Sequence, residues 1–388
     1  MSPRVRPGVD VLLEDPEVYI GSSRVGLITN PTGVTSDLTP TLDGLHSHPD
    51  VEVAAVFGPE HGARGEVQDE INVGSYVDAV TGLHVYSLYG EVRKPTAEML
   101  RGVDVLVFDI QDVGARFYTY ASTMVYALEA ASENGINMIV LDRPNPINGI
   151  KTEGNALESE FASFVGLNPL PIRHGMTIGE LALLLNEEIG AGLEVVEMEG
   201  WSRGMWFDDT GLPWVQPSPN IPTLETAIVY PGTCLFEGVN ISEGRGTTRP
   251  FEVVGAPWMD GPKWSSAMNE LGLGGVRFRA CHFMPVFSKY TGERCRGVQV
   301  HVIDRDRYEP VETGLHMLAT ALSLWPGDFR WLPPSYDRRR HFDLLAGTDK
   351  TRENLSRGVA VEEIVEGWAQ GLRAFDGLRK MHLLYGGG

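Results

Sequence analysis

A group of chemically active residues, Glu60, His61 and Arg64, follows a run of apolar residues in the stretch VEVAAVFGPEHGARGEVQDEINVG, residues 51–74. The run has the composition of a buried strand, and Gly58-Pro59 ends it. Carboxyl groups beside apolar and aromatic side chains can have raised pKa values and act as general acids, and glycoside hydrolysis typically uses carboxyl groups in this way. The stretch therefore predicts a site directly after the strand.

Polar segments also follow other apolar runs of the first half, beginning at Asn30, Asp109 and Asp142. Open parallel sheets bind ligands in the crevice beyond the carboxyl ends of their strands, so these loops are expected to meet in one cleft. Many of their residues are ordinary turn and cap residues, which favours a purely structural interpretation for each loop taken singly. The side chains that no turn requires are Glu60, His61, Arg116, Tyr118, Arg143 and Asn145.

These residues must be positioned by the elements of the first 200 residues. In this part of the sequence apolar runs alternate with helical patterns, as in parallel βαβ units. One helix is marked by a T-x-x-E capping box at Thr177–Glu180 and a stop at Gly190. A Pro-rich passage at 211–232 breaks this rhythm, and short strands and helices follow it. We therefore predict an α/β fold of two domains, residues 1–222 and a smaller α/β (α+β) domain of residues 223–388.

A Gly-rich loop lies within residues 238–258 and contains Glu243, Arg245 and Arg249. Its sequence is unsuited to a regular element, so a loop kept for its side chains is preferred narrowly over a plain connection. Aromatic residues that could stack on sugar rings, or belong to the core, are Tyr118, Tyr120, Trp201, Trp206, Trp214 and Trp258.

Signatures of other chemistries are missing from the sequence. There is no G-x-G-x-x-G after the first strand, no P-loop lysine, no G-x-S-x-G and no H-E-x-x-H, and the three cysteines have no C-x-x-C spacing. We therefore expect no cofactor and no metal. The net charge of −20 disfavours nucleic acid and anionic membranes as partners.

The compartment is predicted from two further absences. No apolar stretch is long enough for a membrane span, and the N-terminus shows no apolar signal-peptide segment. A cytoplasmic location is expected, or a secreted or periplasmic one if a leader has been removed. The oligomeric state is left open.

Five motifs, GPEHGARGE, DIQDVGARFYTY, DRPNPING, QPSPNIPT and SEGRGTTRPFE, together resemble the NamZ-type exo-β-N-acetylmuramidases, glycoside hydrolase family 171. The similarity runs from about Gly8 to near the C-terminus. It implies a Rossmann-like N-terminal domain, a smaller C-terminal α/β domain and a cleft between them. It also implies release of N-acetylmuramic acid from the non-reducing ends of peptidoglycan fragments such as MurNAc-GlcNAc, with Glu60 as the catalytic glutamate.

On this basis Glu60 is expected to be the general acid, with His61 beside it, and the second catalytic group is left open among Asp112, Glu66 and Glu243. The residues expected to bind substrate are Asn30, Arg64, Arg116, Tyr118, Arg143, Asn145, Asn220, Glu243, Arg245 and Arg249. The 3-O-lactyl carboxylate of muramic acid requires a local arginine, for which Arg245 and Arg249 are favoured. The alternatives are a non-catalytic muropeptide-binding protein and an amidase or esterase acting on a related ligand.

Overall fold

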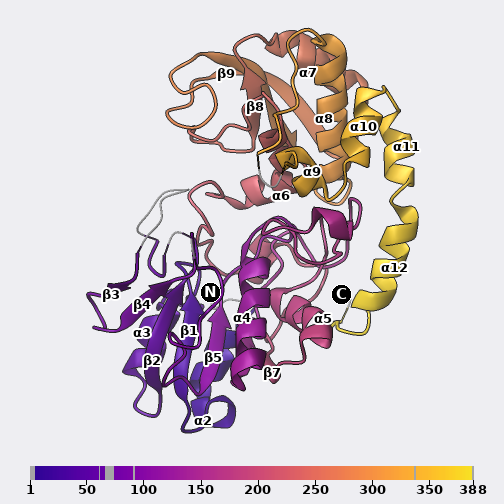
Figure 1. The fold of residues 1–388 in the computed structure, drawn as a ribbon. Coiled ribbons are helices and arrows are strands. Elements are labelled where there is room, and N and C mark those ends of the chain that lie inside the picture. Colours follow the sequence, from indigo (N-terminus) through magenta and orange to yellow (C-terminus); the bar gives the residue numbers. More distant parts are fainter. Residues whose placement is uncertain (1–4, 61, 66–73, 91, 336–337, 387–388) are drawn as a thin grey trace.

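The computed structural model describes residues 5–60, 62–65, 74–90, 92–335 and 338–386, which form two units (Figure 1). The first unit contains a seven-stranded sheet of order β3-β4-β2-β1-β5-β6-β7, in which only the β3–β4 pair is antiparallel. Its strands are β1 (Arg24–Thr29), β2 (Glu52–Gly58), β3 (Tyr76–Val77), β4 (His84–Ser87), β5 (Val105–Asp109), β6 (Asn137–Leu141) and β7 (Leu193–Val196). The predicted α/β class is confirmed.

Both faces of this sheet are covered by helices, which explains why its central strands are apolar almost throughout. In β5, Val105 and Val107 pack with α1 (Gly8–Glu14) and α3 (Thr41–Ser47) on one face. Leu106 and Phe108 pack with α4 (Tyr120–Asn134) and α5 (Ile178–Ile189) on the other. The predicted capping box at the start of α5 is present, and Gly190 ends this helix in the left-handed conformation.

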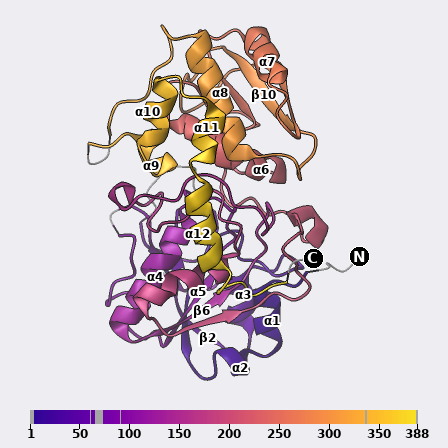
Figure 2. The ribbon, with the colours of Figure 1, turned by 90° about the vertical axis from the view of Figure 1, so that its right-hand side faces the viewer.

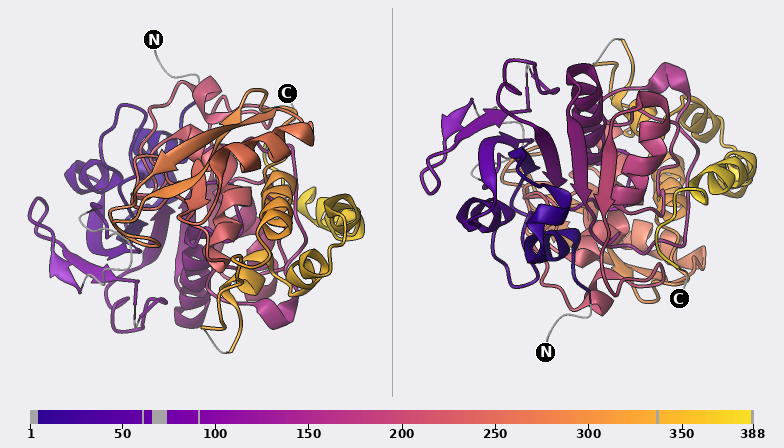
Figure 3. Two further views of the ribbon diagram at one scale, coloured as in Figure 1. Left: turned by 90° about the horizontal axis from the view of Figure 1, so that it is seen from above. Right: turned by 90° about the horizontal axis from the view of Figure 1, so that it is seen from below.

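The second unit contains a three-stranded antiparallel sheet of order β8-β10-β9. Its strands are β8 (Val253–Ala256), β9 (Val276–Phe283) and β10 (Cys295–Val302). Helices α6 (Leu224–Thr233) and α7 (Gly261–Glu270) pack with this sheet, and α8 (Pro310–Leu324) packs on both of them. Helices α9 (His341–Ala346), α10 (Lys350–Ser356) and α11 (Val361–Glu366) follow. Seen from above, this unit covers the central part of the first (Figure 3).

The two units are firmly connected. One hydrophobic cluster extends from β5 and α4 through Ile228 of α6 to Leu315 of α8. Helix α12 (Ala369–Arg379) then returns along the first unit (Figure 2). There Arg379 donates to the carbonyl oxygens of Gly175 and Ile150 at 3.0 and 2.9 Å. The chain end therefore packs on the first unit, although the predicted division at residue 222 assigns it to the second.

None of the helices in the described part of the chain combines the length and apolar character needed to cross a membrane.

Candidate active site

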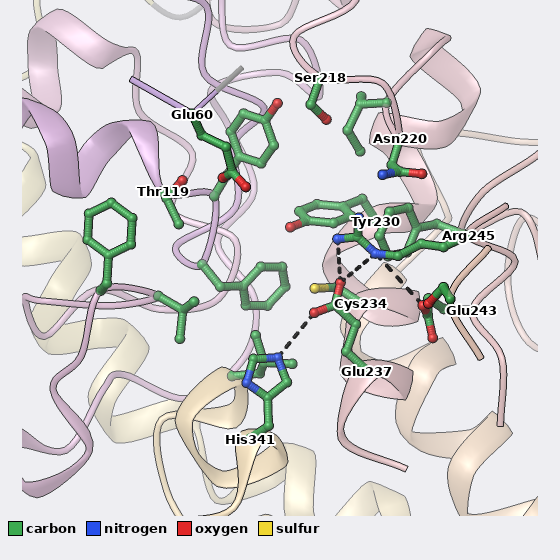
Figure 4. A pocket seen from close by; sticks show the side chains of 18 of the residues that line it. Glu60, Thr119, Ser218, Asn220, Tyr230, Cys234, Glu237, Glu243, Arg245 and His341 are labelled. Carbon is green, nitrogen blue, oxygen red and sulfur yellow. Dashed lines mark hydrogen bonds and ion pairs between the residues drawn. The ribbon is translucent and has the colours of Figure 1, made fainter. Parts of the chain in front are cut away.

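A cavity of about 960 Å³ is lined by residues of both units (Figure 4). Glu60 and Tyr118 belong to the first unit, Asn220 comes from the Pro-rich passage, and Glu237 and Arg245 belong to the second. Ligand sites of small molecules have volumes of roughly 300 to 1,000 Å³. The cavity is therefore large enough for a small ligand of more than one ring.

Glu60 owes its position to the turn that follows β2. The amide of Gly62 donates to the carbonyl oxygen of Pro59 at 3.0 Å, and Gly62 has a positive φ of 77°. A Cβ at Gly58 would lie only 2.7 Å from the amide nitrogen of Ala63, so the strand ends where a side chain has no room. The G-P-E-H-G pattern thus builds a tight turn that directs Glu60 into the cavity, as Figure 4 shows.

Aromatic rings surround the approach to Glu60. Tyr230 packs edge to face with Phe117, Tyr118 and Phe251, at centroid separations of 5.3, 5.9 and 4.8 Å. Burial raises the pKa of the Tyr118 hydroxyl well above its usual value, and nearby groups that include the Glu60 carboxyl add to this effect. Burial likewise raises the pKa of Tyr230. Both hydroxyls therefore stay protonated at neutral pH, and the rings offer apolar faces on which a sugar can stack.

The opposite wall carries two carboxylates and their cations. Glu237, in the 3-10 helix Cys234–Gly238, lies 2.8 Å from Nη2 of Arg245 and 3.1 Å from Nε2 of His341. Burial alone would raise the pKa of Glu237, but Arg245 and His341 outweigh it and hold the pKa well below the usual range. Glu243 binds Nζ of Lys289 at 2.9 Å. The cavity thus has an aromatic wall that carries Glu60 and a charged wall in which Glu237 is ionised.

Several of the residues predicted for the site come together in this cavity. They are Glu60, Tyr118, Asn220, Glu243 and Arg245. His61 and Glu66 lie outside the described residues. The predicted Tyr120 also lines the cavity, whereas the tryptophans considered for stacking are not among its described lining residues.

Three of the predicted arginines lie elsewhere, and their partners explain why. Arg64 binds Asp43 and Asp78 at 2.7 and 2.5 Å. The buried Arg116 donates to three backbone carbonyls, those of Asn155, Leu170 and Leu345, at 2.6 to 2.9 Å. Arg249 binds Glu252 at 2.7 Å. These side chains hold loops and helix ends together, and none is among the described residues that line the cavity.

The loops after β1, β5 and β6 do meet at the carboxyl ends of the strands, but their polar side chains form hydrogen bonds and ion pairs within and between these loops. Arg143 forms two hydrogen bonds with Asp109, at 2.5 and 2.8 Å, and borders a small separate cavity. Asn145 binds backbone groups of Met176 and Ile147. The expectation that Arg143 and Asn145 border the cavity of Glu60 is therefore corrected.

Two further residues of these loops are also away from the cavity lining. Asn30 accepts from the amide of Thr32 at 2.9 Å, as a turn residue does. The buried Asp112 accepts from the amide of Gly114 at 2.6 Å and lies 3.3 Å from Nε2 of His174. Asp112 thus stabilises the turn behind Tyr118 and does not face the cavity as a second catalytic group.

Sequence reasoning missed Glu237, His341, Lys289 and Arg93, which all line the cavity. Glu237, Lys289 and His341 stand in no motif and follow no predicted parallel strand, whereas Arg93 comes shortly after the apolar run LHVYSLYG, residues 83–90, which has the pattern of a strand. For Glu237 the local signal is its position directly before residues 238–258, the stretch that contains the Gly-rich loop. Within the described part of the chain, no group of three or more potential ligands is arranged to hold a metal ion.

The fold and the site together define the class of protein. It is an α/β protein of two units, in which carboxyl groups on two chemically different walls face one shared cavity. Pairs of carboxyl groups in different environments are typical of glycoside hydrolases.

The chain belongs to the family of NamZ exo-β-N-acetylmuramidases. The family model described as "Exo-beta-N-acetylmuramidase NamZ, N-terminal" matches residues 25–225, and the corresponding C-terminal model matches residues 228–385. A relative from Bacillus subtilis (strain 168), named "Peptidoglycan beta-N-acetylmuramidase NamZ", is 53% identical over 385 residues, which are 99% of this chain and 92% of the relative.

Two solved structures share the fold over nearly the whole chain. Both are crystal structures of DUF1343 family proteins from Bacteroides fragilis NCTC 9343. One is 41% identical with a TM-score of 0.91 and covers 98% of this chain and 99% of its own. The other is 30% identical with a TM-score of 0.77 and covers 99% of each chain.

Proposed function

We propose that the protein is an exo-β-N-acetylmuramidase, a glycosidase that releases N-acetylmuramic acid from the non-reducing ends of peptidoglycan fragments such as MurNAc-GlcNAc. The observation that carries this proposal is the position of Glu60, the glutamate of the G-P-E-H-G motif, in a cavity between the two units of a chain that belongs to this family. A cavity of about 960 Å³ suits a terminal sugar and its neighbour better than a polymer strand.

In this function Glu60 acts as the general acid. It donates its proton to the glycosidic oxygen while the bond from that oxygen to the anomeric carbon breaks, and the aglycone leaves as an alcohol. The anomeric carbon gains positive charge in this step and is finally attacked by water. The aromatic wall around Tyr118 and Tyr230 provides the sugar with stacking surfaces.

Glu237 is the second carboxyl group in this proposal. It is ionised, and 20% of its side chain is exposed, compared with 2% for Glu243, so that Glu237 is the more accessible from the cavity. An ionised carboxylate can stabilise the positive charge at the anomeric carbon, attack it, or take a proton from the attacking water. The configuration of the released sugar, measured by NMR at early times, distinguishes a retaining reaction from an inverting one.

The decisive experiment measures free N-acetylmuramic acid released from MurNAc-GlcNAc by the wild type and by Glu60→Gln. Release by the wild type and its loss in the variant are expected. Binding of the disaccharide without turnover would instead support a sugar-binding protein. Turnover of a peptide-linked or acylated ligand, with the glycosidic bond left intact, would support an amidase or esterase.

The cytoplasmic location and the functional division at residue 222 are part of this proposal. Fractionation of producing cells tests the location. Separate expression of residues 1–222 and 223–388 tests the division, and the contacts of α12 with the first unit predict that the first fragment is less stable than it is in the whole chain.

A further inference from the structure

The cavity is lined by three side chains with permanent positive charge, Arg93, Arg245 and Lys289, and their partners differ. Arg245 binds Glu237 at 2.8 Å, and Lys289 binds Glu243 at 2.9 Å. The guanidinium of Arg93 instead lies over the ring of Phe164, with its central carbon 4.3 Å from the ring centroid. Among the described residues, no carboxylate lies within ion-pair distance of Arg93.

We propose that Arg93 binds the carboxylate of the substrate's 3-O-lactyl group and thereby selects muramic acid over glucosamine; this inference rests on the function proposed above. The two sugars differ by the 3-O-lactyl ether, whose carboxyl group is ionised at neutral pH. In a protein of net charge −20 the overall field repels such a group, so a local cation must bind it.

The other arginines considered for this task have carboxylate or carbonyl partners. Arg245, the favoured candidate from the sequence, is bound to Glu237 on one side of the cavity. Arg249, the other favoured candidate, binds Glu252 and does not line the described cavity. A substrate carboxylate at Arg245 would have to compete with an existing charge pair, whereas at Arg93 it would meet no competing carboxylate among the residues that the structure describes.

Arg93 and Glu60 follow neighbouring strands of the sheet, and both line the cavity. Strands β2 and β4 are parallel neighbours with Gly58 opposite Ser87, and the amide of Leu88 donates to the carbonyl oxygen of Gly58 at 2.8 Å. The loop that contains Arg93 therefore starts beside the turn of Glu60. A cation for the lactyl group is needed near the general acid, because both groups act on the same sugar ring.

The contact with Phe164 prepares Arg93 for this role. The contact with the ring restrains the guanidinium without using its N–H groups in an ion pair, and a guanidinium can bind a carboxylate bidentately. The loop of Phe164 is itself held by Ser122 of α4, whose hydroxyl donates to the carbonyl oxygen of Phe164 at 2.8 Å. Arg93 is half-buried, so a bound carboxylate would be partly shielded from water.

The test uses two aryl β-glycosides, one of N-acetylmuramic acid and one of its lactyl carboxamide, which keeps the shape of the lactyl group but removes its charge. The variants are Arg93→Gln and Arg93→Lys, with Arg249→Gln as the control for an arginine outside the cavity. Arg93→Gln should lower kcat/KM for the carboxylate substrate by about 10- to 150-fold, the range for a charge-assisted hydrogen bond, and change it little for the carboxamide. For Arg93→Lys, kcat/KM for the carboxylate substrate should lie between the values of the wild type and Arg93→Gln, because lysine keeps the charge but not the bidentate geometry.

The ratio of kcat/KM for the two substrates is the decisive quantity, because both are measured on one protein preparation and the amount of folded enzyme cancels. An unchanged ratio in Arg93→Gln overturns the assignment of Arg93, even if both rates fall. A wild type that cleaves the glycosidic bond of neither substrate refutes the proposed function instead. A ratio that falls equally in Arg249→Gln also overturns the inference, because the effect would then follow from general charge.

Discussion

Glu153 gives the sharpest test of the electrostatics of the structure. It is buried where the two units meet, and its carboxyl oxygen accepts from the amide of Glu312, in the first turn of α8, at 2.8 Å. Burial, supported by the nearby Glu309, raises the pKa of Glu153 from 4.5 to about 8, although Arg173 and the amide oppose this shift. Glu153 therefore keeps its proton in the folded protein at neutral pH.

The sign of the effect on stability follows from this raised pKa. Between pH 4.5 and about 8 the unfolded chain releases the proton while the folded chain retains it, so the free energy of unfolding falls as pH rises. The slope approaches about 1.4 kcal/mol per pH unit, and the loss at pH 7 amounts to about 3 kcal/mol. Glutamine keeps the hydrogen bond to the amide of Glu312 but cannot ionise.

Glu153→Gln should therefore match the wild type below pH 4.5 and become more stable than it by about 3 kcal/mol at pH 7. Urea unfolding at a series of pH values measures this difference, and Glu98→Gln, at an exposed glutamate, serves as the control because its curve should run parallel to that of the wild type. If the free energy of unfolding depended on pH in the same way in Glu153→Gln and in the wild type, the raised pKa of Glu153 would be refuted.

Three further predictions concern the site and its surroundings. Glu60→Gln should retain the unfolding transition of the wild type and lose at least about 10²-fold in turnover, as is usual for a general acid; near-normal turnover of MurNAc-GlcNAc would exclude Glu60. Glu237→Gln should lose activity to a similar extent, whereas Glu243→Gln, at the less accessible carboxylate, should lose less. A larger loss of kcat in Glu243→Gln than in Glu237→Gln would make Glu243 the second carboxyl group. Arg143→Met leaves the carboxylate of Asp109 buried without its partner and should cost about 3 to 5 kcal/mol of stability. If Arg143→Met instead raised only KM, Arg143 would be a substrate-binding residue.

The sequence was informative where function depends on local backbone geometry. The buried run of β5, the capping box at Thr177 and the G-P-E-H-G turn are all decided by residues near one another in the chain. For the same reason the position of Glu60 after a strand could be predicted. Here short-range sterics, such as the missing space for a Cβ at Gly58, determine the structure.

The role of each charged loop residue could not be predicted in the same way. Arg143 and Arg93 both lie in loops of the first unit, yet Arg143 pairs with the carboxylate of Asp109 whereas Arg93 lies over the ring of Phe164. These partners are 34 and 71 positions away, so they depend on which loops the complete fold brings together. The preferences of turns explain why polar residues follow the strands. They do not reveal that many of these residues bind one another.

The distribution of charge over the cavity assigns different chemistry to its two walls. Arg245 and His341 stabilise the ionised form of Glu237 on one wall, whereas Glu60 lies near the protonated hydroxyl of Tyr118 on the other. A glycosidase needs one carboxyl group to donate a proton and another to carry negative charge, and such different surroundings allow the two roles. Because the walls belong to different units, the distance between Glu60 and Glu237 depends on how the units pack. We therefore expect the contacts between the units that involve Glu153 and α12 to influence this separation, on which the stereochemical course of a glycosidase reaction depends.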